Sequence, residues 1–143
     1  MSDPYNLQRF VDAQAEDFQT ALSELHAGSK QSHWMWYIFP QLAGLGRSST
    51  AKYYGIASMN EARAYLAHPV LGSRLGECLQ VTAQWAGRRS AEQILGPIDS
   101  MKLRSCLTLF EAASGDPAFG AGIDAFFSGH RDEATLALLN AEQ

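Results

Sequence analysis

The sequence predicts an all-α protein, folded as a single compact irregular bundle of about eight short helices. Apolar residues recur at the three- and four-residue spacing typical of helices, and helix-capping residues stand in front of these segments. The alternating Val, Ile and Thr pattern that a sheet would need is missing. The length of 143 residues fits one domain, and 46% apolar residues supply one core. We therefore expect residues 1–143 to form a single helical domain.

Start and stop signals divide the chain into its helices. A side chain that accepts a hydrogen bond from a first-turn amide, often followed by proline, marks a helix start. Glycine or proline marks a helix end. We expect helices to begin at or beside Asp3-Pro4, Ala51, Ser58 (a capping box with Glu61), Pro69, Ser90, Asp99, Asp116-Pro117 and Asp132. We expect ends near Gly28, His68-Pro69, Gly87, Gly96-Pro97 and Gly129.

Charge is distributed unevenly along the chain. The formal net charge is −4, which disfavours nucleic acid as a partner. The segment from Lys30 to Arg104, however, contains nine basic and four acidic residues, whereas the two flanks together contain two basic and eleven acidic residues. A small anionic ligand, if there is one, is therefore expected in the middle of the chain.

Several classes of protein are disfavoured by what the sequence lacks. It has no apolar run long enough for a membrane span and no secretion signal, so we expect a cytoplasmic protein. The sequence does not determine the oligomeric state, and a monomer is the default expectation. Cys78 and Cys106 lie in apolar helical patterns, which is typical of buried thiols. The four histidines lack metal-ligand spacing, so no metal site is expected, and no cofactor can be named.

One block of the sequence is unusually aromatic. It runs over residues 33–41, His-Trp-Met-Trp-Tyr-Ile-Phe-Pro-Gln, and two tyrosines follow at Tyr53 and Tyr54. The more conservative interpretation is a buried segment at the heart of the core. The functional interpretation is an aromatic pocket with His33 and Gln41 as polar groups at its edge, because small-molecule sites are mostly apolar with a few placed polar groups. Both interpretations can hold at once, with some rings in the core and others lining a pocket.

Two further segments allow an anion site. Gly44, Gly46 and Arg47 precede hydroxyl residues and a short helix, and exposed amides at such a position can bind phosphate or carboxylate. The simpler alternative is an N-cap formed by a serine. In the second segment, Lys102 and Ser105 belong to a polar line, spaced by three residues, that faces either solvent or a cleft between helices.

The aromatic block also carries a family resemblance. Together with Leu7-Gln8-Arg9-Phe10-Val11, Lys52-Tyr53-Tyr54-Gly55-Ile56, the His68-Pro69-Val70-Leu71-Gly72 segment and the polar line from Asp99 to Phe110, it resembles a bacterial family of uncharacterised proteins of roughly this length. Members are commonly mislabelled calpastatin, although that inhibitor is a disordered repeat chain. The resemblance implies a compact helical fold and no particular activity.

These observations lead to three functional hypotheses. The first is a site for a phosphorylated or nucleotide-like ligand, in which aromatic rings stack on the flat part and basic groups hold the charge. The predicted ligand-binding residues are His33, Trp34, Trp36, Gln41, Arg47, Ser49, Lys52, Tyr53, Lys102 and Ser105. If the protein is an enzyme, His33 is the candidate acid or base. The second hypothesis is a non-catalytic protein-interaction module with an exposed apolar patch. The third, and weakest, is a nucleic-acid binder.

Overall fold

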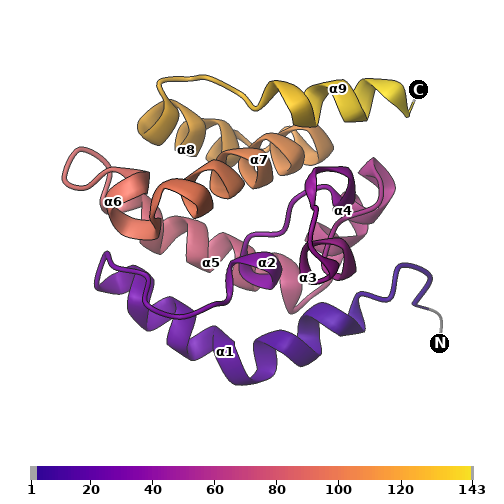
Figure 1. Ribbon diagram of the computed structural model, residues 1–143, viewed down its shortest axis with the longest axis horizontal. Helices are drawn as coiled ribbons and strands as arrows, with labels where there is room; N and C mark the ends of the chain where they lie inside the picture. The colour runs from indigo at the N-terminus through magenta and orange to yellow at the C-terminus, as the bar shows by residue number, and fades with distance from the viewer. Residues whose placement is uncertain (1–2, 143) are drawn as a thin grey trace.

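The structure is a computed structural model that describes residues 3–142; residues 1–2 and 143 of the predicted domain lie outside the described residues. Within that range there are nine α-helices and one short 3-10 helix, with no strand, which confirms the all-α prediction (Figure 1). In chain order they are α1 (Gln8–His26), α2 (Met35–Ile38), η1 (Ala43–Leu45), α3 (Ser49–Tyr53), α4 (Met59–Ala67), α5 (Leu71–Ala83), α6 (Ala91–Leu95), α7 (Pro97–Ser114), α8 (Pro117–Phe127) and α9 (Glu133–Ala141).

Helix α7 is the centre of the bundle. It packs against α4, α6, α8 and α9, whereas α1 packs against α5 and α2. Figure 1 shows α1 along one side of the molecule and α9 along the opposite side, with α5 and α7 between them. None of the helices in residues 3–142 is both long and apolar enough to cross a membrane.

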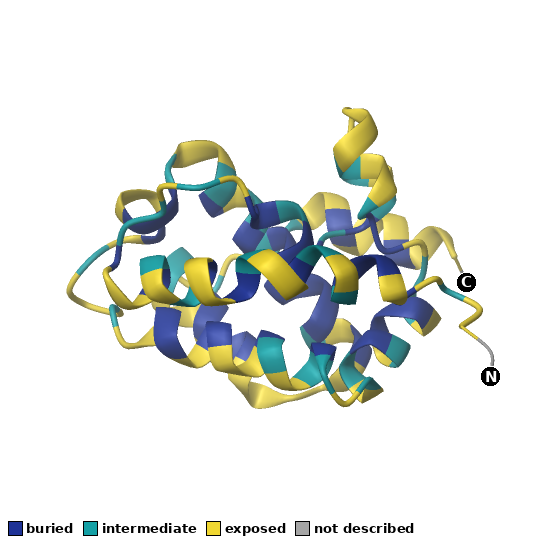
Figure 2. Cartoon of the chain, turned by 90° about the horizontal axis from the view of Figure 1, so that it is seen from below, coloured by how far each residue is buried: buried dark blue, intermediate teal, exposed yellow. Residues whose placement is uncertain are grey.

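A chain of aromatic rings joins four helices through the core. The ring of Tyr65 meets that of Phe10 edge-on at a centroid distance of 5.1 Å and that of Phe110 at 5.3 Å. Phe110 in turn lies 5.9 Å from Phe119. Edge-on and tilted pairs of this kind are the favoured aromatic geometries. Figure 2 shows buried residues on the inward sides of the helices and exposed residues on the outward sides.

Four of the eight predicted helix starts are confirmed by capping hydrogen bonds at the predicted residue. Ser90 forms a full capping box with Gln93, and Ser58, Asp116 and Asp132 each accept a bond from a first-turn amide. The capping box predicted at Ser58 is only half formed, because Glu61 accepts from the amide of Ala57 and not from that of Ser58. These signals are local, so the sequence contains all the information they need.

Two predicted starts are wrong in position. Asp99 does not cap α7, because the helix already begins at Pro97, whose fixed φ suits the first helical position. Asp3 does not stand directly before α1 either. Its carboxylate accepts bonds from the amides of Leu7 and Gln8 across an intervening turn, so α1 begins at Gln8.

The carboxylate of Glu24 holds the segment between α1 and α2 in place through hydrogen bonds. Glu24 accepts hydrogen bonds from the amides of Gln31 and Ser32 at 2.8 and 3.0 Å, from Ser32 Oγ at 2.6 Å and from Trp34 Nε1 at 2.9 Å. Burial opposes ionisation of Glu24, but these bonds outweigh it and lower the pKa of Glu24 to about 2. The aromatic block therefore starts from a fixed position.

The segment that leaves the aromatic block is fixed by a buried arginine. Arg9 donates to the carbonyls of Tyr53 and Gly55 at 2.8 and 2.9 Å and pairs with Glu61 at 2.8 Å. An isolated parallel bridge holds the same segment, in which the Ile56 amide donates to the carbonyl of Gln41 at 2.9 Å. Arg9 thus ties α1, α3 and α4 together.

Candidate functional site

A cleft opens where the segment before α2, α2 itself and the start of α7 meet. We call it the α2–α7 cleft. Its volume is about 290 Å³, and its lining consists of Lys30, His33, Met35, Trp36, Leu95, Gly96, Pro97, Ile98 and Asp99. The wall is mainly apolar, with charged groups at one side, which is the usual composition of a small-molecule site.

Two lysines converge on one carboxylate at this cleft. Lys30 Nζ lies 2.9 Å from one oxygen of Asp99, and Lys102 Nζ lies 3.3 Å from the other. All three side chains are largely removed from solvent, with exposed fractions of 9% for Lys30, 23% for Lys102 and 17% for Asp99. The cluster therefore keeps one positive charge that no carboxylate in it neutralises, in surroundings that screen charge poorly.

The same two ammonium groups stand over indole rings. Lys102 Nζ is 5.1 Å from the ring centroid of Trp36, and Lys30 Nζ is 5.2 Å from that of Trp34. Contacts at this distance are attractive because the face of an aromatic ring carries partial negative charge. They hold the ammonium groups in place beside the cleft.

The aromatic block serves mostly as core. Trp34, Met35, Ile38 and Phe39 are each 1–2% exposed, as expected for the conservative interpretation. Trp34 was predicted to contact ligand, but its buried ring lies in the core and does not line the cleft. Trp36 is half-buried and forms part of the cleft wall, while His33 is exposed at its edge.

The glycine-rich segment before α3 lies elsewhere. Ser48 Oγ accepts a hydrogen bond from the Ala51 amide at 3.1 Å, so the capping interpretation of this segment is the one observed. The four predicted ligand-binding residues around it are exposed and do not line the cleft: Arg47, Ser49, Lys52 and Tyr53. Gln41 is also absent from the lining. The single site that the sequence suggested is thus divided in space.

The polar line on α7 does not face solvent, and that interpretation is wrong. Ser105 and Thr108 are 7% and 1% exposed because the start of α9 packs over them. Ser105 Oγ donates to the Asp132 carboxylate at 3.1 Å, and Thr108 Oγ1 accepts from the Asp132 amide at 3.0 Å. Ser105 is therefore occupied by the helix contact. Of this line only Asp99 lines the cleft, and Lys102 lies beside the cleft through its contacts with Asp99 and Trp36.

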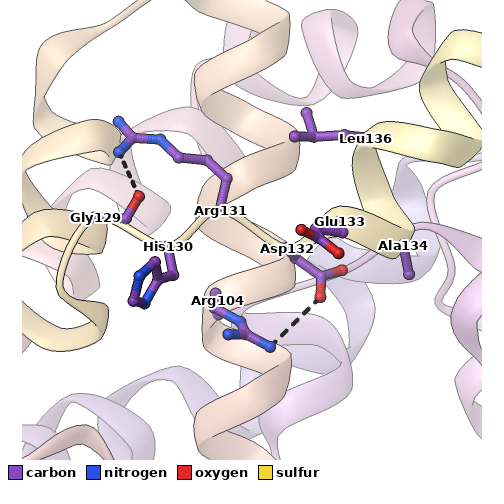
Figure 3. Close-up of a pocket in the computed structure, with 8 residues that line it drawn as sticks. All are labelled: Arg104, Gly129, His130, Arg131, Asp132, Glu133, Ala134 and Leu136. Atoms are coloured by element: carbon purple, nitrogen blue, oxygen red, sulfur yellow. Dashed lines mark hydrogen bonds and ion pairs between the residues drawn. The ribbon is translucent and has the colours of Figure 1, made fainter.

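A larger hollow lies beside the loop from α8 to α9. Its volume is about 680 Å³ (Figure 3). Its lining consists of Arg104, Gly129, His130, Arg131, Asp132, Glu133, Ala134 and Leu136. Arg131 binds Glu111 at 2.6 Å and Asp124 at 3.1 Å, Arg104 lies 3.8 Å from Asp132, and Glu133 forms no ion pair within residues 3–142. Its lining contains two arginines and two acids, Asp132 and Glu133, so it has no net positive charge with which to bind an anion.

The two cysteines are buried, and burial disfavours their thiolate form. Burial raises the pKa of Cys78 to about 12 and that of Cys106 well above its usual range, so neither is a thiolate nucleophile at neutral pH. Among residues 3–142, no three His, Cys, Asp or Glu side chains are grouped to hold a metal ion.

Sequence reasoning missed Lys30 and the pairing role of Asp99. Lys30 is held in place by its amide, which donates to the carbonyl of Ile94 at 2.7 Å. The spacing of Asp99 and Lys102 by three residues was the only local signal for the cluster. Nothing near Lys30 in the sequence points to a partner so distant along the chain.

Comparison with known proteins places the chain in a family. A comparison with curated proteins returned no match. The chain is similar to the conserved hypothetical protein Rv1873 from Mycobacterium tuberculosis, whose crystal structure superposes with a TM-score of 0.94 at 47% sequence identity, covering 96% of this chain and 99% of that one. The family model "Protein of unknown function (DUF1810)" matches residues 4–139. The chain therefore belongs to the DUF1810 family of proteins of unknown function.

Proposed function

We propose that the α2–α7 cleft binds a small anionic metabolite, of the phosphorylated or nucleotide-like class. The observation that carries this proposal is the convergence of Lys30 and Lys102 on Asp99, which keeps one positive charge beside the cleft. A phosphate or carboxylate group of the ligand would supply the missing negative charge, and charge-assisted hydrogen bonds are stronger than neutral ones.

The cleft wall supports a ligand that also has a flat apolar part. Trp36 contributes a half-buried indole ring, and Pro97 and Ile98 supply aliphatic surface from the first turn of α7. Stacking on an indole adds affinity without requiring a particular hydrogen-bond pattern. His33 at the edge of the cleft could donate to the ligand and is the residue to test first for proton transfer.

Thermal unfolding with a panel of nucleotides, ADP-ribose, sugar phosphates and coenzymes tests this proposal. A ligand at a hundred times its dissociation constant should add about 2.7 kcal/mol to the free energy of unfolding, which raises Tm by several degrees. Lys102→Met keeps the alkyl chain but removes the charge, and should weaken binding by about tenfold or more because a charge-assisted bond is lost.

Arg47→Ala is the matched control, since Arg47 is an exposed cation outside the cleft. It should leave the ligand-induced Tm shift unchanged. The proposal fails if no compound in the panel raises Tm. It also fails if Arg47→Ala abolishes the shift while Lys102→Met preserves it, because the ligand would then sit before α3.

A further inference from the structure

A second surface lies at the end of the molecule where α6, the first turns of α7 and the end of α8 meet (Figure 1). Two adjoining cavities of about 390 and 320 Å³ share Ser90 and Phe126 and form one groove. We call this surface the α6–α8 groove. Its lining includes neither Lys30 nor Lys102.

The charge of the groove is opposite to that of the whole protein. Its lining contains Arg88, Arg89 and Arg104 with a single acid, Glu92, a net charge of +2, whereas the chain as a whole carries −4. Within residues 3–142, neither Arg88 nor Arg89 forms an ion pair, and Arg104 reaches Asp132 only at 3.8 Å. The groove thus offers guanidinium groups to an anionic partner.

Two of these arginines are also incompletely hydrogen-bonded. Across the described residues, the buried side-chain nitrogen and oxygen atoms that lack a partner are Nε of Arg89 and Nε of Arg104. Buried polar atoms are nearly always bonded in folded proteins, and an unpaired one is costly. A carboxylate of the partner that accepted a hydrogen bond from either Nε atom would relieve that cost.

The middle of the groove is apolar. Met101 is 59% exposed at its edge, and Phe126 and Phe127 are half-buried in its wall. Exposed Met and aromatic side chains surrounded by polar residues are typical of protein-binding surfaces, where they fill or form pockets.

We infer that the α6–α8 groove docks an extended acidic peptide segment of a partner protein, with apolar side chains between its acidic residues. The carboxylates pair with the arginines, and the apolar side chains contact Met101 and the two phenylalanines. A peptide fits better than a nucleic acid, because Glu92 and the net charge of the chain oppose a continuous phosphate backbone. This inference is independent of the ligand proposed for the α2–α7 cleft.

Selection from a display library of random peptides tests the inference, with the full chain as bait. The expected result is enrichment of sequences that combine Asp or Glu with Leu, Phe or Met. The binding of an enriched peptide, measured by fluorescence anisotropy, should weaken about tenfold or more in Arg88→Glu and by about threefold or more in Met101→Ser. Arg88→Lys should retain most of the binding.

Lys52→Glu is the control, because it makes the same change in net charge at an exposed position outside the groove. It should bind the peptide as the parent does. The inference is overturned if the library yields no enrichment of acidic peptides, or if Arg88→Glu and Lys52→Glu weaken peptide binding equally. It is also overturned if a labelled oligothymidylate binds at Arg88 and the peptides do not. Lys102→Met should leave peptide binding unchanged, and Arg88→Glu should leave the ligand-induced Tm shift unchanged. Either proposal can therefore be wrong while the other holds.

Discussion

Lys30 and Asp99 are joined at 2.9 Å, across a large part of the chain, by a contact that brings the segment before α2 onto the first turn of α7. The ammonium group of Lys30 is nearly buried, and Asp99 is shared with the more exposed Lys102. The contact therefore both shapes the α2–α7 cleft and sets its charge.

Replacing Asp99 should destabilise the protein and raise its affinity for anions. Asp99→Asn leaves Lys30 buried without a counter-charge, and we expect a loss of about 1–3 kcal/mol in the free energy of unfolding, measured by urea denaturation. Lys102→Met should cost less, because Lys102 is more exposed and 3.3 Å from Asp99. Equal costs for the two variants would show that Lys30 does not depend on this carboxylate.

The two tryptophans of the aromatic block should respond differently to truncation. Trp34 is 1% exposed and donates to Glu24, so Trp34→Ala should cost about 3–5 kcal/mol. Trp36 is half-buried in the cleft wall, and Trp36→Ala should cost clearly less while weakening ligand binding. Chemical denaturation of both variants checks this difference. A cost for Trp36→Ala equal to that for Trp34→Ala would assign Trp36 to the core.

Glu24 predicts a specific dependence of stability on pH. Its pKa falls from the ordinary value of 4.5 to about 2 on folding, so the ionised carboxylate stabilises the folded protein fully above pH 4.5. That contribution is lost as the pH falls from 4.5 to about 2. Glu24→Gln should therefore destabilise the protein at neutral pH by about 2 kcal/mol, because bonds to a charged acceptor are weakened.

Urea denaturation of the parent and Glu24→Gln over a series of pH values measures this effect. The difference in unfolding free energy between the two proteins should shrink through the acidic window and become small near its lower end. A difference that stays constant across the window would mean that Glu24 is not ionised in these hydrogen bonds.

Two glycines on α5 make a matched pair. A Cβ on Gly72 would collide with the carbonyl oxygen of Leu66, whereas a Cβ on Gly76 would meet nothing within 4 Å. Gly76→Ala should stabilise the protein by about 0.5–1 kcal/mol, because alanine is the better helix former. Gly72→Ala should destabilise it by about 1–3 kcal/mol, because backbone must shift. Thermal unfolding of both variants checks these two predictions. If Gly72→Ala stabilised the protein, the prediction would be wrong, because α4 and α5 could then move apart at no cost in free energy.

The sequence was informative where structure depends on near neighbours. Ser58, Ser90, Asp116 and Asp132 each cap a helix by bonding an amide two or three residues along the chain. Helical periodicity likewise identifies the apolar faces of the longer helices. Asp99 was misplaced because Pro97, two residues earlier, starts α7 just as well by local rules.

The candidate site was less predictable because it depends on distant residues. The sequence identified His33 and Trp36, which line the cleft, and Lys102, which lies beside it. It joined them, however, to Arg47 and Ser49, which do not line the cleft. Helical spacing alone cannot say which face of α7 is covered by α9, and so it could not predict that Ser105 is buried.

By itself, therefore, the sequence determined the helical class, the positions of several helix starts and the aromatic character of the segment before α3. Only the tertiary structure decided that Trp34 belongs to the core and Trp36 to the cleft, and that Lys30 pairs with Asp99. The physical reason is range. Capping and periodicity act within one or two turns, whereas burial and ion pairing depend on which helices pack together.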